Sequence, residues 1–504
     1  MDKNHSTLTR SDHLGHVIKA WPLFLILLPA FFVLHGFAAN YDAVPVIDAL
    51  FLFFLYACSA LVIAAIAWFY YRDITKASLL ALMVMAWQFF FGAVQDGLKA
   101  GSPAFLSQYR FLLLLGFIIF LALTIWLKKR VNSLRVLSTY LNVLLSLFIL
   151  IDGIKLISKV TKPQKNSFLS TGTAAFTQCD TCRKPDIYLI VLDQYAGSTA
   201  LKEVFNFNNI AFESELDRRQ FHMIPESRSN YNLTPFSIAS LLNMDYLDPT
   251  TVVKKRLDIS YSYRIIRESF VVEFLKANGY RFYNHSVFDF PGQPAHEYGA
   301  FLPYGIKMIS APTFTNRLNR DIRSSILEGK FPFPKAREKI AYEYLHFNDN
   351  IFSLTGGLAG RKDTTPGFIY AHLMMPHYPY YFDSKGRPLP LDKLSGFRHT
   401  NANDYVEYLQ YSNQKILELV DHILATSTTP PVIMLLADHG FRHPGKKTAL
   451  QYDFLSLNTV YLPSRDYSRF YKGMSHVNQF RVFFNSCFQQ KFPLLKDSTI
   501  DLWD

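Results

Sequence analysis

The chain has 504 residues, of which 50% are apolar and 16% aromatic, and its formal net charge is +12. This length exceeds one ordinary domain, and the concentration of apolar residues before residue 160 excludes a wholly soluble protein. Basic residues can serve membrane topology, acidic lipids or an anionic substrate, so the charge must be interpreted by position.

Five hydrophobic stretches follow one another in the first third of the chain. Each is close to the roughly 17–25 residues that cross a bilayer as a helix, and aromatic residues lie at several of their ends, as interfacial aromatics do. Buried helices of a soluble protein would not give five such runs in succession. We therefore expect a five-helix transmembrane domain over residues 21–158, with helices at about Trp21–Ala39, Ala49–Tyr70, Ala77–Val94, Phe111–Leu127 and Val136–Ile157.

The charges between these stretches predict their orientation. The first and third loops contain only Lys99 and Arg110, whereas the amino-terminal segment 1–20 and the other two loops contain Lys3, Arg10, Lys19, Arg72, Lys76, Lys128, Lys129, Arg130 and Arg135. The positive-inside rule places the amino terminus in the cytoplasm and everything after the fifth crossing outside. Asp152 and Lys155, in the last turns of the fifth stretch, are expected to pair or to extend toward the interface.

A polar connector over residues 159–184 is the predicted extracytoplasmic linker. It ends in Cys179-Asp-Thr-Cys182, which outside the cytoplasm most simply forms a local disulfide. A redox motif would need a helix behind it, and a zinc knuckle would need a second cysteine pair.

Residues 185–504 provide ample length for a large α/β domain. Continuous apolar runs predict buried strands of a mostly parallel sheet between helices. The expected elements are strands at Asp186–Leu192, Phe221–Ile224, Gly367–His372 and Val432–Ala437, and helices near Ala200–Arg219 and Asn403–Leu424.

Polar side chains with metal-binding or nucleophilic chemistry follow these strands. Asp193 ends the first strand and Asp438-His439 ends the last one. Open α/β sheets bind their ligands at the carboxyl ends of strands, and carboxylates and imidazoles both bind metals. His372 and His377 lie at the end of the third strand and in the loop behind it.

Thr234 is the candidate nucleophile. Pro235 follows it, which predicts a helix start with Thr234 at the N-cap, where a hydroxyl can also face a bound anion. The alternative is that Thr234 only caps the helix. Ser227, Ser229 and Ser237 remain rival nucleophiles on sequence alone.

With these motifs in this order, the chain resembles membrane-anchored members of the alkaline phosphatase superfamily, in the group of lipoteichoic acid synthases and phosphoethanolamine transferases. The resemblance implies five membrane helices and an extracytoplasmic sulfatase-like domain. It also implies metal ligands at Asp193, Thr234, Asp438 and His439, with Thr234 as nucleophile. His377 matches the histidine before a proline that contacts the substrate phosphate, and His372 fits the same loop.

Some positions depart from the wider superfamily. Sulfatases carry Cys/Ser-x-Pro-x-Arg for formylglycine formation, whereas Phe236 and Ile238 stand at the Pro and Arg positions after Thr234, so formylglycine chemistry is not expected. Gln194 replaces the second acid of two-metal members, which favours one principal metal, Zn²⁺ or Mn²⁺. His443 and His476 are the candidates for a further substrate-binding histidine.

The resemblance implies a transferase that moves a phospho-head group from a membrane lipid donor to a cell-envelope glycan or lipid through a phospho-threonine intermediate. Its expected location is the bacterial cytoplasmic membrane, with no nucleic acid partner and with the oligomeric state left open. A hydrolase that uses water as acceptor is the second enzyme class. A catalytically silent envelope scaffold is the alternative of another class, although the retained ligand-type residues argue against it.

Overall fold

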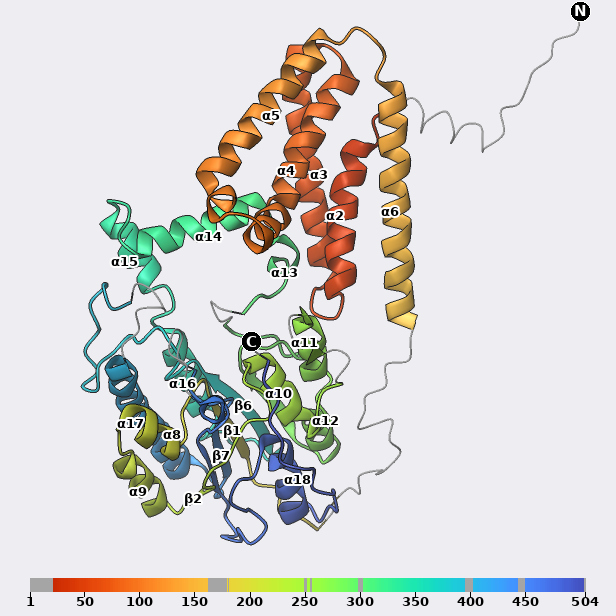
Figure 1. The fold of residues 1–504 in the computed structure, drawn as a ribbon. Helices are drawn as coiled ribbons and strands as arrows, with labels where there is room; N and C mark the ends of the chain where they lie inside the picture. The colour runs from red at the N-terminus through yellow and green to blue at the C-terminus, as the bar shows by residue number, and fades with distance from the viewer. Residues whose placement is uncertain are drawn as a thin grey trace, which may run out of the picture. The chain divides into compact units, whose positions relative to one another are not determined.

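A computed structural model describes residues 21–161, 179, 181–248, 252–253, 256–297, 302–394, 402–442 and 449–502. The chain divides into two compact units (Figure 1). The first contains Met1–Gln164 and Pro303–Ile322, and the second contains Lys165–Leu302 and Arg323–Asp504.

The first unit is a bundle of apolar helices, as predicted. They are α2 (Phe24–Asn40), α3 (Val46–Tyr71), α4 (Ile74–Gly101), α5 (Tyr109–Lys129) and α6 (Arg135–Thr161), with the short 3₁₀ helix η1 (Ala104–Ser107) before α5. Four of them, α3 to α6, are long and apolar enough to cross a membrane, and α2 is an apolar helix of 17 residues. Large apolar side chains such as Phe117 and Ile118 on α5 are exposed, as expected for a surface that faces lipid.

The segment Pro303–Ile322 folds with these helices, although the sequence placed it in the catalytic domain. It contains α13 (Lys307–Ser310) and the start of α14 (Phe314–Leu327). The Gly92 N–H donates to the Pro312 carbonyl at 3.0 Å, and a Cβ at Gly92 would lie 2.3 Å from that oxygen. The close approach therefore requires glycine. An ion pair between Arg317 and Asp96 is a second contact between this segment and α4.

The second unit is built on a six-stranded mixed sheet, with strand order β2-β8-β7-β1-β6-β5. The strands β5, β6, β1 and β7 are parallel, with β5 at one edge of the sheet, while β8 runs antiparallel to both β7 and β2. The strands are β1 (Ile187–Leu192), β2 (His222–Met223), β5 (Arg281–His285), β6 (Gly367–Leu373), β7 (Val432–Ala437) and β8 (Asn458–Tyr461), and β3 (Val252–Val253) pairs separately with β4 (Arg256–Leu257).

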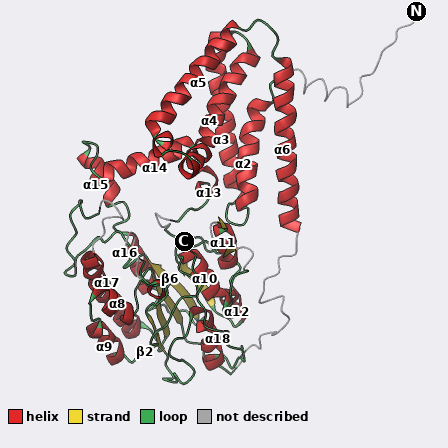
Figure 2. Ribbon diagram, viewed as in Figure 1, coloured by secondary structure: helices red, strands yellow, loops and turns green. Residues whose placement is uncertain are grey.

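Helices cover both faces of this sheet (Figures 1 and 2). On one side lie α8 (Ser198–Phe205), α9 (Ile210–Arg218), α16 (Phe347–Gly357) and α17 (Ala402–Thr426), and on the other lie α10 (Thr234–Asn243), α12 (Phe270–Ala277) and α18 (His476–Cys487). The unit also contains α11 (Ile259–Arg267), α15 (Pro334–Ala341) and η3 (Leu450–Asp453). Every side chain of β1 and β7 is buried, as the apolar runs predicted. The helix expected near Ala200–Arg219 is two helices, because Asn206 adopts a left-handed φ of 51° between them.

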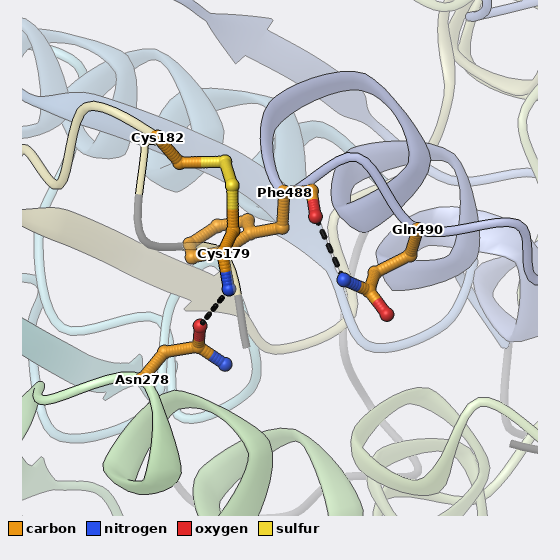
Figure 3. The surroundings of a disulfide bond; sticks show 5 residues. All are labelled: Cys179, Cys182, Asn278, Phe488 and Gln490. Carbon is orange, nitrogen blue, oxygen red and sulfur yellow. Dashed lines mark hydrogen bonds between the residues drawn. A yellow bond between two sulfur atoms is a disulfide. The ribbon is translucent and has the colours of Figure 1, made fainter. Parts of the chain in front are cut away.

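A disulfide joins Cys179 and Cys182 and confirms the predicted local bridge (Figure 3). The Cys179 N–H donates to Oδ1 of Asn278, which follows the end of α12, at 3.3 Å. Nearby, the Gln490 side-chain amide donates to the Phe488 carbonyl at 2.7 Å. The hydrogen bond to Asn278 therefore attaches the bridged segment to the end of α12 shortly before β1 begins.

Candidate active site

The order of the three central strands brings two carboxylates and a histidine together. Because β1 pairs in parallel with both β6 and β7, the residues that follow β1 and β7 emerge at one edge of the sheet. Asp193 follows β1 and Asp438 follows β7, while His372 lies within β6 opposite Val191. The Asp193 N–H donates to the Leu373 carbonyl at 2.9 Å and the Asp438 N–H to the Leu192 carbonyl at 3.1 Å.

Asp193, His372 and Asp438 form a group that could hold a metal ion. One potential ligand atom from each lies within 4.8 Å of the others, and all three side chains are fully buried. Within the described chain, both carboxylate oxygens of Asp193, Oδ2 of Asp438 and Nε2 of His372 have no hydrogen-bond partner. Such groups are costly to bury unpaired. Burial and the neighbouring charge of Asp438 raise the pKa of Asp193 well above its usual value, and a divalent cation would relieve both effects. The residues present therefore fit a metal site.

Backbone donors determine which oxygen of Asp438 faces this group. Its Oδ1 accepts the Gln194 N–H at 2.9 Å and the His439 N–H at 2.8 Å, which leaves Oδ2 as the free ligand atom. Gln194 reaches this position with a left-handed φ of 61°, a conformation that few non-glycine residues adopt. Gln194, the second residue after β1, thus contributes its backbone N–H to the site.

His439 presents its Nε2 to the group. Its Nδ1 contacts the Gly440 carbonyl at 2.8 Å, and since a carbonyl only accepts, Nδ1 carries the proton. Nε2 lies 3.4 Å from Oδ2 of Asp438. Burial, aided by the charge of Arg442, lowers the pKa of His439 well below its usual value, so the ring is neutral, as a metal ligand must be.

Thr234 is close to His439, but it does not cap its helix as predicted. Leu233 is the N-cap of α10, and Thr234 is the first residue of the helix. The Thr234 hydroxyl lies 3.5 Å from Nε2 of His439. The predicted alternative of a purely capping threonine is therefore wrong, because the hydroxyl faces the site instead.

The rival serines are placed differently. The Ser227 hydroxyl donates to the Met474 carbonyl at 2.9 Å, and the Ser237 hydroxyl donates to the carbonyl of Asp438. The buried Ser229 hydroxyl has no partner within the described residues. Of the four candidates, only Thr234 has a hydroxyl in hydrogen-bond range of a predicted metal-binding side chain.

His377 lies in a loop with two cis peptide bonds, before Pro376 and Pro379. Its Nδ1 donates to the Tyr378 carbonyl at 2.5 Å. Burial lowers the pKa of His377 to about 4, and the nearby charges of Arg442, His439 and Asp438 also act on it. The histidine therefore shares the electrostatic environment of the predicted metal ligands.

The other predicted histidines have different outcomes. His372, predicted to bind substrate, lies among the potential metal ligands, with Nε2 4.0 Å from Oδ2 of Asp193. His476 begins α18 and lies 3.4 Å from the Ser456 hydroxyl. Burial lowers its pKa to about 3. His443 lies outside the described residues.

The sequence interpretation missed Arg442. Its Nη2 lies 3.2 Å from Nε2 of His439, and the charges of Asp438 and Asp193 partly oppose the lowering of its pKa by burial. A guanidinium in this position can bind phosphate oxygens in a bidentate manner. The only signal in the sequence was a basic residue three positions after His439.

No family model matches the chain, and no curated protein does. The solved structures that it resembles include phosphoethanolamine transferases and sulfatases. Lipooligosaccharide phosphoethanolamine transferase A from Neisseria meningitidis, an integral membrane protein, is 13% identical over 92% of this chain and 94% of its own, with a TM-score of 0.36.

Two periplasmic domains are similar to a shorter part of the chain. That of phosphoethanolamine transferase EptC from Campylobacter jejuni is 13% identical over 62% of this chain and 92% of its own, with a TM-score of 0.35. That of EptC from Escherichia coli, solved with zinc, is 11% identical over 61% of this chain and 84% of its own, with a TM-score of 0.35.

Proposed function

We propose that this chain is a membrane-anchored, metal-dependent transferase that moves a phosphoethanolamine- or glycerophosphate-like head group from a lipid donor to a cell-envelope glycan or lipid. The observation that carries the proposal is the buried group of Asp193, His372 and Asp438, whose ligand atoms lack hydrogen-bond partners among the described residues, near the Thr234 hydroxyl. The order of these motifs in the sequence supports the same reaction class.

Asp193, Asp438 and His439 would hold one divalent metal, Zn²⁺ or Mn²⁺, with Thr234 beside it, and His372 is placed to contribute a further ligand. When bound, the metal supplies Lewis-acid chemistry that lowers the pKa of a coordinated hydroxyl and neutralises phosphoryl charge. Arg442 adds a second positive charge for the phosphoryl oxygens.

Thr234 is the nucleophile of a two-step displacement. Its Oγ1 attacks the phosphorus of the donor diester, the Thr–O–P bond forms, and the bond to the diacylglycerol oxygen breaks. The proton lost by the hydroxyl is regained by the departing oxygen, and we assign this transfer to His377. An acceptor hydroxyl then attacks the phospho-threonine, which transfers the head group and restores the Thr234 hydroxyl.

The membrane unit gives this reaction its substrate supply. With the amino terminus in the cytoplasm of a bacterial cell, the second unit lies outside the cytoplasmic membrane. A chain anchored in the bilayer that contains the donor works at a high effective concentration of head groups. Envelope glycans or lipids on the same side are the acceptors.

Labelled phospholipid tests the proposal. The full chain in detergent micelles is incubated with phospholipid labelled in its head group, with and without an envelope lipid or glycan fraction. A transferase retains label on Thr234 when acceptor is absent and passes it to the acceptor when acceptor is present. Release of label to water at the same rate without acceptor would identify a hydrolase. A chain with neither labelled product nor bound metal would be a scaffold.

A further inference from the structure

A charged cluster lies within the first unit, far along the sequence from the candidate active site. Asp152 on α6 contacts His35 on α2 through Oδ2 and Nδ1 at 2.9 Å, and its Oδ1 contacts Nζ of Lys155 at 3.2 Å. The Asp152 side chain is only 5% exposed, whereas those of His35 and Lys155 are 61% and 60% exposed. The predicted pairing of Asp152 with Lys155 is present, and His35 extends it to a second helix.

The cluster lies near the end of the membrane helices at which α6 leads toward the catalytic part of the chain. Lys155 is six residues before the last residue of α6, Thr161, or about 9 Å along the helix axis. Lys159 lies one turn further and donates to the Ala38 carbonyl, close to the end of α2, at 2.8 Å. Lysine side chains this close to the end of a membrane-spanning helix can extend to the lipid head groups.

The two lysines retain charge and donors for a ligand. Lys155, Lys159 and Asp152 together carry a net charge of +1, and of the two ammonium groups only that of Lys155 contacts the carboxylate. Each ammonium has three N–H donors. Lys155 uses one on Asp152, and Lys159 contacts the carbonyls of Ala38 and Ala39, which do not neutralise its charge. At least one donor on each side chain is therefore left for an anion.

We infer that Lys155 and Lys159 bind the phosphate of a phospholipid head group, with Asp152 and His35 as positioning residues that hold Lys155 at the helix surface. A buried carboxylate is expensive in a membrane, and here its contacts with Lys155 on α6 and His35 on α2 offset that cost. This inference rests on the proposed function in one respect only: the site would supply donor lipid to the reaction. Lipid binding itself does not depend on turnover.

The test measures the melting temperature of the full chain in neutral detergent micelles, with increasing phosphatidylglycerol or phosphatidylethanolamine. A ligand that binds only the folded state raises the melting temperature, and the shift grows with the logarithm of one plus the ratio of ligand concentration to Kd. Lys155→Gln with Lys159→Gln should weaken the apparent phospholipid affinity by about thirtyfold, since each lysine at a membrane surface contributes about fivefold. Inorganic phosphate, which has no acyl chains, should cause no comparable shift.

Lys128→Gln is the matched control. Lys128 also lies at a helix end, donates to a carbonyl, that of Tyr70 at 3.2 Å, and stands over a tyrosine ring at 4.4 Å, but it belongs to the opposite end of the bundle. Its replacement should leave the lipid-induced shift unchanged. Asp152→Asn should lower the shift as well as the melting temperature without lipid.

Three results would overturn the inference: an unchanged lipid shift in the double lysine variant, an equal shift with inorganic phosphate, or an Asp152→Asn protein that melts lower but keeps the full shift. The last result would make Asp152 a structural link between helices only. Failure of the transfer reaction with an intact lipid shift would instead refute the proposed function and leave this site in place.

Discussion

The hydroxyl of Thr234 and Nε2 of His439 lie 3.5 Å apart although 205 residues separate them in sequence. Thr234 begins α10 and His439 follows β7, so the contact joins a helix start to the carboxyl end of a strand. The Nδ1 proton of His439 is engaged with the Gly440 carbonyl, which leaves Nε2 as an acceptor within range of both Arg442 Nη2, at 3.2 Å, and the Thr234 hydroxyl. The proposed metal ligand His439 and the proposed nucleophile Thr234 thus lie within hydrogen-bond range of each other.

Thr234→Ala should abolish the covalent intermediate and nearly all transfer activity. Among the described residues, the hydroxyl contacts His439 rather than a backbone N–H of α10, so the stability loss should stay below the ~0.5–2 kcal/mol of a lost cap. Thr234→Ser should retain part of the activity because the hydroxyl survives. Mass spectrometry of protein trapped with donor lipid locates the adduct, and Ser227→Ala is the control that should keep it. An adduct on a serine, or full activity of Thr234→Ala, would refute the assignment.

Asp438→Asn combined with His439→Ala should remove bound metal and activity. The fold should persist, because the apolar side chains of β7 fill the core and these two residues lie beyond its end. Elemental analysis of the purified chain measures the metal, and circular dichroism checks the fold. Stoichiometric metal in the double variant would show that the ligands are elsewhere. His372→Ala provides the comparison: a loss of metal there would make His372 a ligand rather than a substrate-binding residue.

The sequence predicted the positions of Asp193 and Asp438 because long apolar runs identify parallel strands, and parallel strands deliver their next residues to one edge. The sequence could not decide the role of His372. The end of a strand can be misplaced by one residue or more, and such a shift moves His372 from the strand into the loop that follows it. Arg442 was missed because nothing in its local pattern distinguishes a buried guanidinium from a solvated one.

The membrane helices could also be predicted, from the composition and length of the apolar stretches. The packing of Pro303–Ile322 against the membrane helices could not be predicted, because α13 is too short and α14 too polar to be recognised as membrane-associated. Their contacts depend on close approach at Gly92 and on single pairs such as Arg317 with Asp96. Such contacts are specified by tertiary structure and have no periodic signal.

His377→Ala should slow turnover by about 10²–10⁴-fold if the residue transfers a proton in the reaction, with metal content unchanged. Burial lowers the pKa of His377 to about 4 in the unliganded protein, and a bound phosphate would raise that pKa by favouring the charged ring. Steady-state rates and metal analysis of the same preparation test the role. Loss of metal in this variant would identify His377 as a ligand.

The orientation of the membrane unit is tested with reporters. A periplasmically active enzyme fused after Lys159 should be active, and the same enzyme fused after Arg135 should be inactive, because nine basic residues against two place the amino terminus inside. A cytoplasmically active reporter should give the reverse pattern at the same positions. If the periplasmic reporter were active after Arg135 and inactive after Lys159, the predicted orientation would be wrong.

Acid should destabilise the fold partly through His476. Burial lowers its pKa to about 3 in the folded chain, whereas an unfolded histidine titrates near ~6.5. The unfolded state therefore takes up the proton first, and stability is fully present above the unfolded pKa and lost as pH falls from about 6.5 toward 3. At pH 5 the free energy of unfolding is lower by about 2 kcal/mol through this group.

His476→Gln should lack this contribution, so its free energy of unfolding should change less than that of the wild type between pH 7.5 and pH 5 in urea titrations. His346→Gln, at a side chain that is 82% exposed, should follow the wild type. Equal acid sensitivity of His476→Gln and the wild type would show that His476 is not protonated selectively in the unfolded state.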